Sequence, residues 1–155
     1  TIWPQAHAQS IMTAQALRKV GAKVDLQAMD WNTLTQRRLK KDAPGSGSPG
    51  WDLFFTTWPT ITMSSPITNV PLDCSCNKAW YGWPCDEKMQ QLRDDYFKAT
   101  TFEEQKKVTE ALQKRFYEFV PYINTGQVVE VNAWRSNIKN VIPFMQMVFW
   151  NIEKH

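Results

Sequence analysis

The sequence has few of the residues that catalysis usually requires. Only two histidines occur in 155 residues, one in the first predicted helix and one at the last position, so a histidine-based dyad or triad has little support. No glycine-rich phosphate loop, Walker lysine or G-x-S-x-G turn is present. The adjacent carboxylates at residues 94–95 and 103–104 fall in predicted helices, where neighbouring side chains point apart. We therefore predict that the chain is not an enzyme.

A strong charge of one sign and long apolar runs are also missing. The net charge is only +3, and the densest basic cluster, residues 37–41, sits where a helix should end, a position that favours cations. We expect no nucleic-acid partner. The uncharged residues 53–72 are interrupted by proline, threonine and serine, which argues against a membrane helix. Residues 1–17 lack the charge order of a signal peptide, so we expect a mature chain or a fragment of a longer protein.

Cysteine is scarce, and its count is odd. Three cysteines, with neither histidine nearby, are too few for a structural zinc site, and we expect neither a metal nor a cofactor. The short loop around them is rich in proline and aromatic residues, which fits an oxidising compartment. Cys76 and Cys85 are the expected disulfide pair, because a bond between Cys74 and Cys76 would strain the backbone. Cys74 is then left over.

Aromatic residues, by contrast, are abundant, and residues 76–86 concentrate them. This stretch, CNKAWYGWPCD, holds two cysteines, Trp80, Tyr81, Trp83 and a glycine- and proline-marked turn. Eight Trp and eight Phe in one chain cannot all be buried easily, and exposed rings usually line a pocket or an interface. Two interpretations remain open, namely a structural loop closed by a disulfide and a rigid loop that faces a ligand.

The first third of the chain alternates between helix and strand patterns. Apolar residues at three- and four-residue spacing predict a helix over residues 5–20, with Ala8, Ile11, Met12, Ala16, Leu17 and Val20 on its buried face. Residues 23–30 alternate as a half-buried strand does. Asp30 can cap a second helix over residues 31–41. After a loop at residues 42–50, residues 51–58 read as a strand buried on both faces. This order predicts an α/β fold with a parallel sheet.

The remainder begins with a long irregular segment, residues 59–85. Irregular segments of this length in a compact domain usually have a function. Trp58 precedes it at the end of the buried strand, the edge where open α/β sheets bind ligands. Helices are predicted over residues 86–99 and, after a capping box at Thr101, up to residue 119. Strands are predicted at residues 121–125, 128–134, 138–142 and 145–152.

Four stretches resemble one family. Residues 9–24, QSIMTAQALRKVGAKV, resemble its helix and glycine turn, and residues 51–58 resemble its strand that ends in tryptophan. Residues 76–86 resemble a specific cysteine- and tryptophan-rich motif, and residues 149–154 resemble its C-terminal ending. The family is that of the extracellular solute-binding proteins of family 5, which are the dipeptide, oligopeptide and nickel-binding receptors of ABC importers.

The resemblance implies a periplasmic, non-catalytic protein that binds a small solute, possibly a peptide, between two lobes and delivers it to permease subunits. This chain would be the C-terminal lobe, a single domain over residues 1–155 with residues 143–155 as its final strand segment. Its fold would be a three-layer sandwich with a mixed, largely parallel sheet, as in one lobe of the type II periplasmic-binding-protein fold. The N-terminal lobe of the same parent protein would form the other wall of the cleft.

The resemblance also implies that Trp58, Trp80, Tyr81 and Trp83 are this lobe's ligand-binding residues. Asn69 and Asp73, in the long irregular segment between them, are further candidates that the resemblance does not place. Many peptide-binding members carry an acid after the tryptophan that ends the strand, whereas Pro59 follows Trp58 here, so the usual contact with a free amino group is missing. Asp73 or Asp86 could replace it. Each aromatic residue could instead serve only in core packing. The alternative function is a self-contained secreted module that stacks exposed rings on a carbohydrate or another small ligand.

Overall fold

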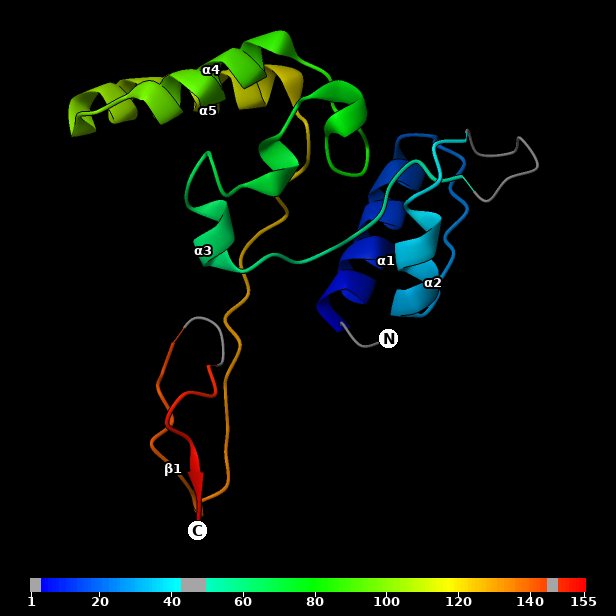
Figure 1. Cartoon of the computed structure of the whole chain (residues 1–155). Coiled ribbons are helices and arrows are strands. Elements are labelled where there is room, and N and C mark those ends of the chain that lie inside the picture. Colours follow the sequence, from blue (N-terminus) through cyan, green and yellow to red (C-terminus); the bar gives the residue numbers. More distant parts are fainter. Residues whose placement is uncertain (1–3, 43–49, 145–147) are drawn as a thin grey trace. The chain divides into compact units, whose positions relative to one another are not determined.

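A computed structural model describes residues 4–42, 50–144 and 148–155. The chain divides into two compact units, Thr1–Thr57 and Trp58–His155, and each is described by itself (Figure 1). Residues 1–3, most of the predicted loop at 42–50 and residues 145–147 of the last predicted strand lie outside the described residues.

The first unit contains two helices, as its sequence predicts. Helix α1 spans Pro4–Lys19 and ends at Gly21, whose φ of 89° suits the left-handed position after a helix. Helix α2 spans Trp31–Arg37, shorter than predicted. Its predicted cap is confirmed, because the Asp30 side chain accepts a hydrogen bond from the Thr33 backbone N–H at 3.1 Å.

The buried face of α1 was predicted wrongly. Met12 is 69% exposed and Val20 is 80% exposed, although both belong to the predicted apolar face. Of the six residues on the predicted face only Leu17 is half-buried, and the buried side runs from it through Ala14 and the half-buried Ser10. Small and polar residues interrupt every face of this helix, so its own amphipathicity is weak and packing against the rest of the unit decides which side is covered.

The two segments that were predicted as strands in this unit form no ladder among the described residues. Residues 22–30 run without helix, turn or bend, and residues 51–59 do so apart from a bend at Asp52. A strand exists as a sheet element only when its backbone groups pair with a neighbour, and no pairing of these segments is found. Both segments instead line a cavity, which is described below.

The second unit is built around two consecutive helices, α4 over Glu87–Lys98 and α5 over Phe102–Phe119. Both helices and the capping box of α5 are confirmed: the Thr101 hydroxyl accepts from the Glu104 N–H, and the Glu104 side chain accepts from the Thr101 N–H. The two helices pack against each other. Their core consists of Leu72, Cys74, Met89, Leu92 and Leu112, with Val108, Phe116, Phe119 and Tyr122 packed against it.

Shorter elements fill the long segment that precedes α4 and the tail that follows α5. They are α3 at Thr60–Met63 and the 3-10 turns at Val70–Leu72 and Cys76–Lys78. In the tail, β1 at Ile138–Lys139 pairs antiparallel with β2 at Glu153–Lys154. The predicted strands at 121–125 and 128–134 have no ladder partner in the described part of the chain, and Val131 is 91% exposed.

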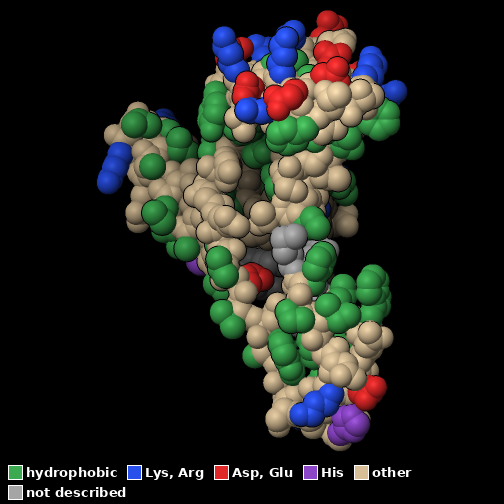
Figure 2. Space-filling view, turned by 90° about the vertical axis from the view of Figure 1, so that its left-hand side faces the viewer, with side chains coloured by type: hydrophobic (Ala, Val, Ile, Leu, Met, Phe, Trp, Pro, Cys, Tyr) green, Lys and Arg blue, Asp and Glu red, His purple; other side chains and the backbone are tan. Residues whose placement is uncertain are grey.

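The surface of this unit is mixed in character. Lys, Arg, Asp and Glu side chains crowd together over α4 and α5, while hydrophobic side chains are more frequent over the C-terminal segment (Figure 2). No helix among the described residues is long and apolar enough to cross a membrane.

Candidate functional site

The loop over residues 76–85 is closed by a disulfide, and the predicted pairing of Cys76 with Cys85 is confirmed. The Cys76 N–H donates to the Pro84 carbonyl at 3.0 Å, and the Trp83 N–H donates to the Trp80 carbonyl at 2.8 Å. Gly82 takes a φ of 99° in the turn between them, a value that glycine adopts without steric cost. The disulfide and these hydrogen bonds hold the aromatic side chains of the loop in one arrangement.

Three of the predicted aromatic residues come together. Trp58, which lies 22 residues before Trp80 in the chain, meets it edge to face with ring centroids 5.4 Å apart. Trp80 in turn contacts Tyr81 at 5.1 Å. All three rings are half-buried, so each keeps part of its surface open to solvent. Trp83 belongs to the same closed loop and is also half-buried.

Asn69 and Trp58 each carry a buried polar atom without a hydrogen-bond partner among the described residues. Asn69 is only 6% exposed, and its Nδ2 donates to the Tyr122 hydroxyl at 3.0 Å. Its Oδ1 has no donor, and the indole nitrogen of Trp58 has no acceptor. An unsatisfied buried polar atom costs about 1–3 kcal/mol. The two atoms offer one acceptor and one donor.

Asp73 is already engaged within the protein. Its Oδ1 lies 3.3 Å from a guanidinium nitrogen of Arg93 and accepts a hydrogen bond from the Ser75 N–H at 3.0 Å. Arg93 also donates to the carbonyl of Pro66 at 3.1 Å. These contacts tie the segment before the loop to α4. A ligand's amino group would therefore have to compete with Arg93 for this carboxylate.

Asp86 closes the other end of the loop and is engaged too. Its Oδ1 accepts from the Met89 N–H at 2.8 Å, capping α4, and from Arg115 Nε at 3.0 Å. A second nitrogen of Arg115 contacts Oδ2, so the pair is bidentate. The hydrogen bond from Arg115 is the main reason that the pKa of Asp86 lies below its ordinary value. Sequence reasoning missed Arg115, because 29 residues separate the partners and no local pattern joins them.

Cys74, the cysteine that the expected pairing left over, is a free thiol in the core of the second unit. Burial, followed by the nearby carboxylates of Asp86 and Asp73, raises its pKa to about 11. A thiol that stays protonated is a poor nucleophile and a poor metal ligand. Within the described ranges, no group of three or more His, Cys, Asp or Glu side chains could hold a metal ion.

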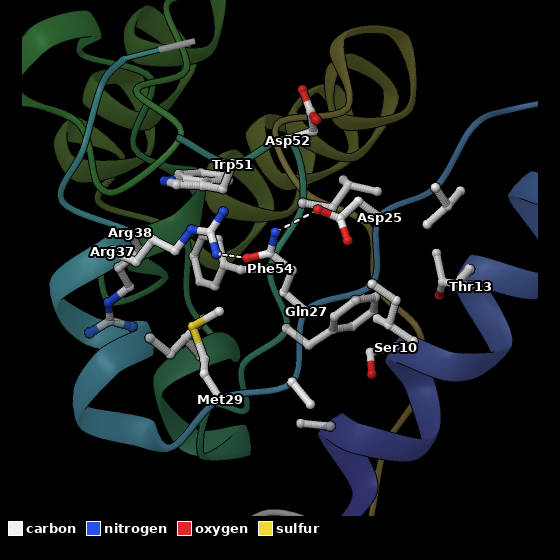
Figure 3. Close-up of a pocket in the computed structure, with 18 of the residues that line it drawn as sticks. Ser10, Thr13, Asp25, Gln27, Met29, Arg37, Arg38, Trp51, Asp52 and Phe54 are labelled. Atoms are coloured by element: carbon white, nitrogen blue, oxygen red, sulfur yellow. Dashed lines mark hydrogen bonds between the residues drawn. The ribbon is translucent and has the colours of Figure 1, made fainter. Parts of the chain in front are cut away.

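Sequence reasoning also missed a cavity of about 420 Å³ in the first unit (Figure 3). Its walls come from α1, α2 and residues 22–29 and 50–55. Arg37 donates to the Gly50 carbonyl at 2.8 Å and to the side chain of Gln27, which itself donates to Asp25. In the sequence these residues have the patterns of helices and strands. Such patterns predict secondary structure, and they do not show that the segments would enclose a cavity. None of the six predicted ligand-binding residues lines it.

A comparison with known proteins shows that the chain is similar to one of them over almost its whole length. No family model matches. The chain is 30% identical over 154 residues, 99% of its length, to a protein of Sinorhizobium fredii (strain NBRC 101917 / NGR234) named "Probable peptide ABC transporter periplasmic-binding protein y4tO". The match covers 29% of that relative. The chain is therefore related to a periplasmic solute-binding protein and spans less than a third of the relative's length.

Proposed function

We propose that the chain is part of the substrate-binding component of an ABC transporter, which captures a peptide-like or similar small solute and delivers it to the permease subunits. The observation that carries this proposal is the 30% identity to a peptide ABC transporter periplasmic-binding protein over 99% of the chain. An identity that extends over all elements, and not over one motif, supports a common architecture. The disulfide in the aromatic loop fits the oxidising periplasm in which such proteins work.

In this proposal the chain is the C-terminal lobe of a two-lobed protein, with residues 143–155 as its final strand segment. The fold of the lobe in the whole protein is a three-layer α/β sandwich with a mixed, largely parallel sheet. The N-terminal lobe of the same parent protein supplies the opposite wall of the cleft. The match to only 29% of the relative supports a longer parent protein, and the non-helical segments at 22–30 and 51–59 are the candidates for sheet strands.

The site of this lobe is formed by Trp58 and the loop residues Trp80, Tyr81 and Trp83. Their rings offer flat apolar surfaces that suit the side chains of a peptide. The Trp58 indole N–H and the Asn69 side-chain oxygen, both buried without a partner in the described residues, would hydrogen-bond to the solute. A peptide group supplies both complements, a carbonyl for the indole and an N–H for the amide oxygen.

The charge distribution bears on which solutes bind. Asp73 is paired with Arg93 and Asp86 with Arg115. Neither of these two carboxylates is therefore unoccupied and ready to bind the free amino group of a solute. We therefore expect recognition of the peptide backbone and of apolar side chains in preference to a charged terminus. Each neutral hydrogen bond contributes roughly 0.5–1.5 kcal/mol net.

The test is a thermal-shift screen with peptides and sugars on this chain and on a longer protein that contains it. A solute at about 100 times its Kd should stabilise the protein by about 2.7 kcal/mol. We expect peptides to stabilise the longer protein and the isolated chain to respond weakly, because one wall of the cleft is missing. Stabilisation of the chain alone by a saccharide would favour a self-contained carbohydrate module and refute the proposal.

A matched pair of variants locates the site. Trp58→Phe keeps an aromatic ring but removes the indole donor, so peptide binding by the longer protein should weaken between about two- and twelve-fold, the equivalent of one hydrogen bond. Trp134→Phe removes the same donor from a half-exposed position in the same unit and should leave binding unchanged. Equal effects of the two substitutions would exclude Trp58 from the site.

A further inference from the structure

The segment that follows α5 is tied at two points to the segment that follows Trp58. The Asn69 side chain donates to the Tyr122 hydroxyl at 3.0 Å, and the Gln127 side chain donates to the Thr60 hydroxyl at 3.3 Å. Along the chain from Tyr122 to Gln127 the contacted residue changes from 69 to 60, so the two segments run in opposite directions. Figure 1 shows the later segment passing beside α3. Gln127 therefore reaches the start of α3, which lies two residues after Trp58.

A local turn sets the position of Gln127. The Asn124 side chain accepts a hydrogen bond from the Gly126 N–H at 3.2 Å, an arrangement that turns the chain immediately before Gln127. Gly126 has a φ of 141°, which residues with a side chain rarely adopt. Gln127 and its partner Thr60 are both exposed, so a solute can reach this pair of side chains.

The hydrogen bond to Thr60 uses the amide nitrogen of Gln127. The amide oxygen of Gln127 has no protein donor in the part of the chain that the structure describes. Asn69 has the same arrangement, because its Nδ2 is bonded to Tyr122 while its Oδ1 lacks a donor among the described residues. Each tie between the segments therefore uses an amide N–H and leaves an amide oxygen, which accepts hydrogen bonds but cannot donate them.

We propose that Gln127 is a further solute-binding residue of the site formed by Trp58 and the aromatic loop, and that its amide oxygen accepts a hydrogen bond from an N–H group of the solute. This inference rests on the proposed function. Together with the oxygen of Asn69, Gln127 gives this wall two acceptors in addition to the Trp58 donor. Two acceptors match a solute with successive N–H groups, as a peptide of three or more residues has. The site should therefore prefer such peptides to solutes of the same shape that lack one N–H.

A structural role for Gln127 makes a different prediction. If this residue only ties its segment to α3, its replacement should lower stability or weaken the binding of every solute equally. If its oxygen contacts the solute, the effect of its replacement should depend on one particular N–H of the solute. Stability should then change little, because the hydrogen bond joins two exposed residues and substitutions at such positions usually have small effects.

The experiment measures the Kd of trialanine and trileucine for the longer protein by titration calorimetry. Each peptide is compared with two analogues in which one peptide N–H is replaced by an ester oxygen, which removes a donor without adding bulk. In the unmodified protein each analogue should bind about two- to twelve-fold more weakly than its peptide, the equivalent of one neutral hydrogen bond. Gln127→Met should weaken peptide binding by a similar factor and should no longer distinguish the peptide from one of the two analogues.

Two further variants complete the design. Gln127→Glu keeps an oxygen acceptor but has no amide nitrogen, so it should bind the peptides at least as tightly as the unmodified protein. Gln113→Met replaces another exposed glutamine of the same unit, on α5, and should leave every Kd unchanged. The Tm of each variant without solute should equal that of the unmodified protein.

The possible contrary results separate this inference from the proposed function. If the peptides bind and Gln127→Met leaves their Kd unchanged, Gln127 lies outside the site, while the proposed function stands. Equal weakening by Gln127→Met and Gln127→Glu would assign the contact to the amide nitrogen and refute the acceptor role. Equal weakening of a peptide and both its ester analogues in Gln127→Met would show a structural role only. Failure of the unmodified longer protein to bind any peptide would refute the proposed function and this inference with it.

Discussion

Removing the disulfide between Cys76 and Cys85 should destabilise the second unit by a calculable amount. The bond joins residues nine apart, so it closes a loop of about ten residues. In the loop-entropy description this corresponds to about 9 cal/mol/K of lost entropy in the unfolded chain, or about 2.7 kcal/mol at 25 °C. For a unit of about 100 residues, 1 kcal/mol shifts Tm by about 4–8 °C, so the double variant Cys76→Ala/Cys85→Ala should melt about 10–20 °C lower.

Thermal unfolding followed by tryptophan fluorescence is the appropriate assay, because Trp80 lies inside the closed loop and contacts Trp58. The control uses a reductant. It should lower the Tm of the unmodified chain by the same amount and leave the double variant unchanged, since the remaining Cys74 is a buried free thiol. A Tm shift below about 3 °C in the variant, or a further shift of the variant on reduction, would refute the reasoning.

Three further predictions concern the core of the second unit. Met89→Ala should cost about 2–5 kcal/mol in denaturant unfolding, because Met89 is completely buried; the exposed Met12→Ala should cost almost nothing, and comparable losses would contradict the assigned core. The pKa of Asp86 is lower in the folded chain, so its contribution to the free energy of unfolding is present above its unfolded pKa of 3.8 and is lost as the pH falls through the lower folded value. Arg115→Met should reduce this dependence of stability on pH in acid. An unchanged dependence would exclude the ion pair as its cause. The pKa of Cys74 is raised from 9.0 to about 11, so stability should be fully present below pH 9 and fall as the pH rises toward 11, and the fall should be smaller in Cys74→Ala.

Local patterns in the sequence were enough for several features. The caps at Asp30 and Thr101 each join a side chain to an N–H three residues away, so the two partners are within reach whatever the rest of the chain does. The pairing of Cys76 with Cys85 was predicted because a bond between Cys74 and Cys76 would strain the backbone, and the structure confirms the pair. The contact of Trp58 with the aromatic loop is not local, and the resemblance to a known family, not the composition, placed these residues at one site.

Features that depend on distant partners could not be predicted in the same way. Arg115 pairs with Asp86 across 29 residues, and Asn69 donates to Tyr122 across 53. The buried side of α1 was predicted wrongly, because the sequence shows which residues are apolar but not which element will cover them. The strand pattern of residues 23–30 predicted a preference for extended backbone, whereas a ladder also requires a partner strand.

The sequence by itself determined approximately where the long helices of the second unit begin and end, how α5 is capped, which cysteines pair and which stretch concentrates aromatic side chains. These features depend on neighbours within a few residues, whose separation the covalent chain limits. Only the tertiary structure decided which face of α1 is buried, which arginine holds Asp86, and that two strand-like segments line a cavity. It also decided which polar atoms of Trp58 and Asn69 lack a partner within the described part of the chain. These depend on which surfaces meet after the chain has folded, and that is a property of all the packing contacts together.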